Sequence, residues 1–185
     1  MATTAPDALL AGCGAGALGG LAALAFMLLD GAVRGEGWLS VVNLAAAGIF
    51  PSAARSASLS VATWAGGSVT VLTGAAVGVL ATPLLAPLGR RPGLCRLVAM
   101  IVAIGWYVLS FRLLWPELNG QLVLNQPLPG MLFVHVIFGV GLGLYPDLIP
   151  RPKPAPRGPF YLPPIRQESA APPPPPESSR HPGVD

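Results

Sequence analysis

The chain has 185 residues, of which 52% are hydrophobic and only 10% are charged, and its mean hydropathy is +0.62. This composition excludes an ordinary water-soluble domain and predicts an all-α integral membrane protein. The formal net charge of +3 comes from basic residues whose positions membrane topology explains, so it does not indicate binding to nucleic acid.

A motif near the N-terminus resembles the cleavage box of a bacterial lipoprotein. Residues 10–13 read Leu-Ala-Gly-Cys. A lipoprotein signal needs a basic start and an apolar stretch before the box. Here no Lys or Arg precedes Cys13, and the long apolar run follows it as far as Leu29. We therefore expect Cys13 to be an ordinary residue of the first helix.

Four windows contain the roughly 20 mostly apolar residues that a helix needs to cross a bilayer. They predict a four-helix membrane bundle over residues 1–146. The expected helices cover residues 8–29, 59–85, 97–115 and 127–146.

The connection after the first helix contains a second apolar segment, from Trp38 to Phe50, which ends before Pro51 and is too short to span. One interpretation is a helix lying in the membrane interface, with Ser40, Asn43 and Ala47 forming its less apolar stripe. The alternative is a re-entrant segment, which is tolerated only where protein or water surrounds it. We favour the interfacial helix.

The ends of the second and fourth windows resemble each other. VGVLATPLLAP, residues 77–87, matches VGLGLYPDLIP, residues 140–150, at Val, both Pro, one Gly and one Leu. A duplicated hairpin would make the bundle two parallel helical hairpins related by an axis along the membrane normal. Chance is the alternative, because Gly and Pro are abundant and the first and third windows show no similarity.

The C-terminal tail, residues 147–185, contains thirteen prolines and few large apolar side chains. Such a segment buries too little surface to offset the entropy of ordering, so we expect disorder with polyproline II stretches. Docking through residues 159–164 or 172–176 is an alternative to a passive, solvated tail, which we favour.

Basic residues predict the orientation, because Lys and Arg stay on the cytoplasmic side. Eight lie on one side, at Arg90, Arg91, Arg96, Arg151, Lys153, Arg157, Arg166 and Arg180. The other side has three, at Arg34, Arg55 and Arg112. Both termini should be cytoplasmic, and Trp38, Trp64 and Trp115 should anchor the outer interface. Ten of the eleven basic residues are Arg, and Ala, Gly and Pro are abundant, which favours a high-GC bacterial source and its inner membrane.

Three ionisable residues fall within or at the ends of the apolar windows, namely Asp30, Arg112 and His135. Such residues are costly in a bilayer and are functional candidates by default. When positions are counted around an α-helix, each of the three shares a helix face with small residues that should meet neighbouring helices. One hypothesis is a polar cluster in which Asp30 pairs with Arg112 above His135 as a proton or ion relay. We favour the other, in which Asp30 and Arg112 reach the headgroups and His135 bonds a neighbouring backbone or hydroxyl group.

Glycine spacing is the strongest motif, because small residues four apart let helix backbones touch. The predicted packing positions are Gly12, Gly16, Gly20, Gly74, Gly78, Gly139 and Gly143. The stretch HVIFGVGLGLYP resembles the closing helix of small uncharacterised bacterial four-helix membrane proteins. That resemblance implies no activity.

The remaining motifs give little support for a catalytic, redox or metal-binding function. His135 has no second intramembrane histidine with which to hold a b-type haem, and Cys13 and Cys95 form no CxxC pair. The chain has no HExxH, GxSxG or P-loop pattern, and no intramembrane Glu of the kind expected in a four-helix multidrug antiporter. We expect no catalytic residue, cofactor or metal. The expected contacts are lipid and either a membrane protein partner or further copies of this chain. The favoured function is a non-enzymatic accessory or assembly subunit; the alternative is a homo-oligomeric transporter or channel for small solutes or ions.

Overall fold

Four long apolar helices make up the membrane part of this protein. The computed structural model describes residues 4–56, 58–126 and 128–150, and within these it is all-helical. The long helices are α1 (Ala5–Val33), α3 (Val61–Leu85), α4 (Pro92–Leu109) and α7 (Leu128–Leu142). With their short extensions they form four segments long and apolar enough to cross a membrane. The predicted four-helix integral membrane architecture is confirmed.

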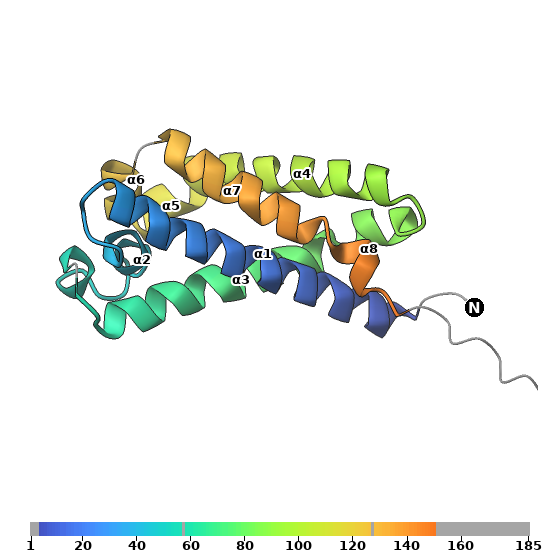
Figure 1. Ribbon diagram of the computed structural model, residues 1–185, viewed down its shortest axis with the longest axis horizontal. Helices are drawn as coiled ribbons and strands as arrows, with labels where there is room; N and C mark the ends of the chain where they lie inside the picture. Colours follow the sequence, from blue (N-terminus) through green and yellow to red (C-terminus); the bar gives the residue numbers. More distant parts are fainter. Residues whose placement is uncertain (1–3, 57, 127, 151–185) are drawn as a thin grey trace, which may run out of the picture. The chain divides into compact units, whose positions relative to one another are not determined.

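Short helical elements join the long ones. They are α2 (Ser40–Ala45), η1 (Ala53–Arg55), η2 (Ala86–Leu88), the π-helical turn η3 (Ser110–Leu114), α5 (Trp115–Leu118), α6 (Gly120–Asn125) and α8 (Tyr145–Leu148). In Figure 1 the start of α1, the α3–α4 connection and α8 lie at one end of the bundle, which we call the arginine end after Arg90, Arg91 and Arg96. Helices α2, α5 and α6 lie at the opposite end, which we call the loop end.

Two of the long helices, α1 and α4, begin before the predicted apolar windows because local signals, rather than hydropathy, set where they begin. The Thr4 side chain caps α1 by accepting a hydrogen bond from the Asp7 amide, so the helix begins at Ala5. Pro92 begins α4 in the first turn, where its missing N–H costs no hydrogen bond. The predicted tail boundary was also too early, since Asp147 belongs to α8. Residues 151–185 of the predicted disordered tail lie outside the described residues.

Helices α1 and α3 meet through glycines at almost every turn of their contact. A Cβ on Gly12 would lie 2.7 Å from the carbonyl oxygen of Gly78, and one on Gly20 would lie 3.0 Å from that of Thr70. A Cβ on Gly16 would collide with the Gly74 carbonyl oxygen. These are the close backbone approaches that the four-residue glycine spacing predicted.

Helix α7 packs between α1 and α4, but through different glycines. A Cβ on Gly141 would collide with the Cα of Gly19, neither of which the spacing rule identified. Gly139 faces α4, where an added Cβ would lie 2.9 Å from that of Ala103. Gly143 lies beyond the end of α7, and the nearest atom outside its own helix is Cγ of Arg96, at 3.3 Å. Gly143 therefore brings no second backbone into contact.

The two stretches that resemble each other in sequence make different contacts. Gly78 packs on α1 within its own hairpin, whereas the aligned Gly141 packs on α1 of the other hairpin. Pro83 lies inside α3, whereas the aligned Pro146 lies in the first turn of α8. The bundle has two helical hairpins, but the matched residues do not occupy equivalent positions.

The apolar segment after α1 packs against protein rather than presenting its polar stripe outward. Val41, Val42 and Asn43 of α2 are fully buried, and Ala47 is buried beyond its end, against α1 and α3. Asn43 and Ala47, two members of the predicted less apolar stripe, are therefore buried against protein, while the choice between an interfacial and a re-entrant segment stays a prediction. Asn43 is buried because it finds its hydrogen-bond partners inside the protein, in the segment that leads into α3.

Candidate functional site

His135 is a buried ionisable side chain near the middle of the bundle, on α7. It is 9% exposed, and its Nδ1 lies 2.8 Å from the carbonyl oxygen of Met131, one turn earlier. A carbonyl oxygen only accepts, so Nδ1 must carry the proton and donate. The other ring nitrogen, Nε2, is then unprotonated and carries a lone pair. Among the described residues Nε2 has no hydrogen-bond partner.

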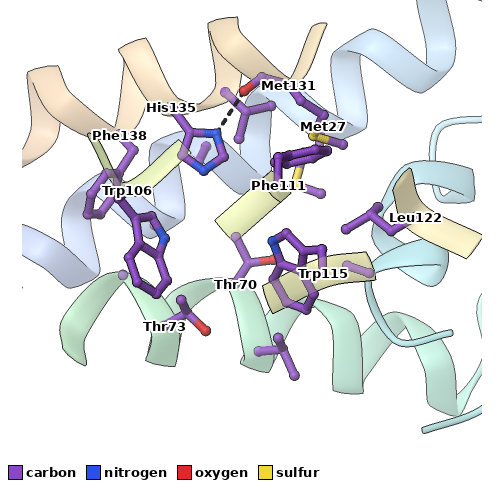
Figure 2. A pocket seen from close by; sticks show the side chains of 16 residues that line it. Met27, Thr70, Thr73, Trp106, Phe111, Trp115, Leu122, Met131, His135 and Phe138 are labelled. Carbon is purple, nitrogen blue, oxygen red and sulfur yellow. Dashed lines mark hydrogen bonds between the residues drawn. The ribbon is translucent and has the colours of Figure 1, made fainter. Parts of the chain in front are cut away.

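A cavity of about 80 Å³ lies beside His135 and is lined by residues of α1, α3, α4, α7 and the loop-end elements. Figure 2 shows the imidazole with Nδ1 turned toward Met131 and its second nitrogen turned toward the cavity. The walls are mostly apolar or aromatic, with the hydroxyls of Thr70 and Thr73 on one side. The largest lining side chains are Met27, Trp106, Phe111, Trp115, Leu122, Met131 and Phe138.

Aromatic rings hold the imidazole in place. The Tyr107 ring centroid lies 5.2 Å from that of His135 and the Phe111 centroid lies 6.0 Å away, both in edge-to-face geometry. The Tyr107 hydroxyl donates to the Leu128 carbonyl oxygen at 3.3 Å, which ties α4 to the start of α7. This packing restricts rotation of the ring, so that Nε2 stays directed into the cavity.

The π-helical turn η3 and the first residue of α5 supply two of the cavity-lining side chains, Phe111 and Trp115. Pro116 has no amide hydrogen, and its ring crowds the carbonyl four residues earlier, so the regular α-helical hydrogen bond is lost at this point. The wider turn from Ser110 to Leu114 accommodates the interruption and rotates the residues that follow it. As a result Phe111 is buried and Trp115 lines the cavity instead of lying fully at the surface. The predicted outer tryptophans Trp38 and Trp64 are exposed.

Asp30 and Arg112 do not join His135 in one cluster. Asp30 pairs with Arg34 at 3.0 Å, one turn later on the same helix. The Arg34 guanidinium also pairs with Glu36 at 3.2 Å and donates to Gln126 at 2.9 Å. No ion pair joins Asp30 to Arg112 in residues 4–56, 58–126 and 128–150, and Arg112 is exposed.

The reason for the different pairing is the length of α1. The predicted apolar window ends at Leu29, but α1 continues to Val33 and Arg34 is its C-cap. An acidic residue four positions before a basic one lies on the same helix face. Local spacing therefore gives Asp30 a partner before any other helix can do so.

Loop-end polar residues form a second set of contacts that sequence patterns did not identify. Asn119 donates from Nδ2 to the carbonyl oxygens of Leu44 and Ala45 at 2.9 and 3.2 Å, and accepts from the Leu122 amide at 3.1 Å. It therefore caps the end of α2 and the beginning of α6 together. Gln126 is also buried, beneath Arg34. Neither residue lies in an apolar window, so only the folded arrangement reveals them.

No group of three or more His, Cys, Asp and Glu residues that could hold a metal ion occurs in the part of the chain that the structure describes. No protein-family model, curated protein or solved structure matches the chain. The function is therefore argued from the surfaces and the cavity of the bundle.

Proposed function

We propose that this integral membrane protein is a non-enzymatic subunit that packs against another membrane protein through the exposed face of α4. The observation that carries this proposal is Gly105, about one turn before the end of α4. A Cβ added there would meet no described atom within 4 Å. Glycine inside a helix destabilises it by about 0.5–1 kcal/mol relative to alanine. In α1 and α3 close backbone contact compensates for this cost, but nothing in the described chain compensates at Gly105.

The rest of the α4 surface supports the same proposal. Its buried residues are only Cys95, Ala99 and Ala103, a narrow stripe. Ile101 and Val108, which lie one turn on either side of Gly105, are 60% and 52% exposed. A glycine flanked by large apolar side chains fits the backbone of a partner helix, because small residues permit close approach in a bilayer.

The transporter alternative loses its main support. It depended on Asp30 and Arg112 forming a polar route with His135, but the Asp30 carboxylate is paired with Arg34.

The subunit proposal is tested by native mass spectrometry of the protein extracted from its own membrane in a mild detergent. We expect the wild-type chain to retain a second polypeptide at a fixed stoichiometry. Gly105→Leu should lose it, because the added side chain blocks backbone approach. The matched control is Ala76→Leu on the exposed face of α3, which should retain the partner. A wild-type chain found only as a monomer or homo-oligomer, or a partner retained by Gly105→Leu, would overturn the proposal.

We further propose that both termini face the cytoplasm of a bacterial inner membrane. Arg90 and Arg91 are exposed at the arginine end, together with the start of α1 and α8. In a cysteine-free background, a maleimide that cannot cross membranes should label Ser52→Cys at the loop end in intact cells. Arg90→Cys should react only after permeabilisation. The reverse labelling pattern would contradict this orientation and place both termini outside the cell.

A further inference from the structure

His135 supplies one half of an unusual donor set in the cavity. Its Nδ1 donates to a backbone carbonyl, which is the arrangement that fixes and orients metal-ligating histidines. The His135 side chain is more than nine-tenths buried, and its unprotonated nitrogen, Nε2, faces the cavity. A lone pair in such a position is satisfied only by a hydrogen-bond donor or a cation that enters the cavity.

Two thioethers supply the other half. Met131 lies one turn before His135 on α7, and Met27 reaches the same cavity from α1. Both are buried, at 3% and 4% exposure. In Figure 2 both side chains lie beside Phe111, whose ring centroid is 6.0 Å from that of His135. Methionine side chains are unbranched and adapt their rotamers readily, so their sulfurs can turn toward a bound ion.

The charge of this donor set selects the kind of cation. An unprotonated imidazole and two thioethers are all neutral, and the lining residues include no carboxylate or thiol. A divalent ion would therefore leave two uncompensated charges in an apolar surrounding, which is costly. Soft thioether sulfur and imidazole nitrogen together favour Cu(I), which carries a single charge. A cavity of about 80 Å³ is large enough to hold a single ion of this size.

We propose that Met27, Met131 and His135 form a binding site for Cu(I) inside the bundle. The site binds the ion by coordination alone, with no electron transfer and no proton released from these ligands. It does not depend on the subunit function proposed above, because the three ligands all belong to this chain.

Two cysteines require a modified parent protein for the test, because thiolates also bind Cu(I). Cys13 lies 14 residues before Met27 on α1, or about 21 Å away along the helix. Cys95 is buried at the other end of α4, near the Leu85 carbonyl. Neither residue lines the cavity, so a Cys13→Ala/Cys95→Ala chain retains the proposed site and removes the competing sulfur ligands.

The experiment is a Cu(I) titration of this cysteine-free full-length chain in detergent, under reducing conditions, against a chromogenic chelator. Ag(I) serves as a second probe that does not change oxidation state. We expect one ion per chain. His135→Ala and Met27→Leu should each weaken binding by more than the roughly 10- to 100-fold caused by losing an outer partner of a metal ligand. X-ray absorption of the Cu(I) complex should show both sulfur and nitrogen neighbours, with less sulfur in Met27→Leu.

Met100→Leu is the matched control, because Met100 packs on Gly139 and does not line the cavity. This variant should bind Cu(I) as the parent does. Circular dichroism and thermal unfolding establish that each variant is folded. The proposal is overturned if the folded parent binds neither ion, if His135→Ala and Met27→Leu bind normally, or if Met100→Leu is weakened as much as Met27→Leu.

Discussion

Replacing Gly16 by alanine is expected to destabilise the bundle by about 1–3 kcal/mol, the usual cost of adding a group to a close-packed interior. The new methyl would collide with the Gly74 carbonyl oxygen and lie 2.9 Å from the Cα of Gly78. These are backbone atoms, so no side chain can rotate to make room. Helices α1 and α3 would have to separate along their contact, and the neighbouring approaches at Gly12 and Gly20 would loosen with them.

Gly14→Ala is the matched control, because it makes the same chemical change two residues away on the same helix. A Cβ at Gly14 would lie 3.5 Å from Cδ1 of Leu148, an ordinary contact with a side chain. The greater helix propensity of alanine should leave this variant as stable as the wild type or slightly more so. Both free energies of unfolding can be measured by titration with denaturing detergent in mixed micelles. Equal stability of the two variants would show that the α1–α3 contact is not as close as described.

Hydropathy and glycine spacing predicted the bundle because each expresses a requirement that the bilayer imposes locally. A window of apolar residues must be long enough to cross, and four-residue glycine spacing on α1 matches that on α3. The contact between Gly19 and Gly141 escaped prediction because it is a single crossing point of two helices. No spacing within either helix marks it, and it depends on how α7 crosses α1.

The candidate site was predicted only in part. The rule that intramembrane ionisable residues are functional candidates identified His135. It could not identify the cavity, because this space depends on the π-helical turn that brings Phe111 and Trp115 inward. The rule also overlooked Met27 and Met131, since methionine in an apolar helix has no signature that separates a ligand from a packing residue.

Buried polar residues between the long helices were the least predictable feature. One of them, Asn43 of α2, is the site of the second substitution with a large expected effect on stability. Its amide nitrogen donates to the carbonyl oxygens of Ser56 and Ser58 at 2.6 and 3.1 Å, and its amide oxygen accepts from the Thr63 hydroxyl at 2.5 Å. Asn43→Leu keeps a side chain of similar size but removes all three bonds. We expect a loss of about 2–4 kcal/mol, because each bond contributes roughly 1 kcal/mol and the partly buried partner groups lose their bond to Asn43.

The comparison that isolates this effect is Ser58→Ala. It removes an exposed hydroxyl but keeps the carbonyl oxygen that Asn43 binds, so its free energy of unfolding should be close to that of the wild type. Thr63 also accepts the Ser60 amide in the capping box that begins α3. Asn43→Leu should therefore loosen the first turn of α3 and increase proteolytic cleavage between residues 48 and 60. Unchanged cleavage and stability would mean that apolar packing alone holds α2 on the bundle, and that the buried amide is not needed there.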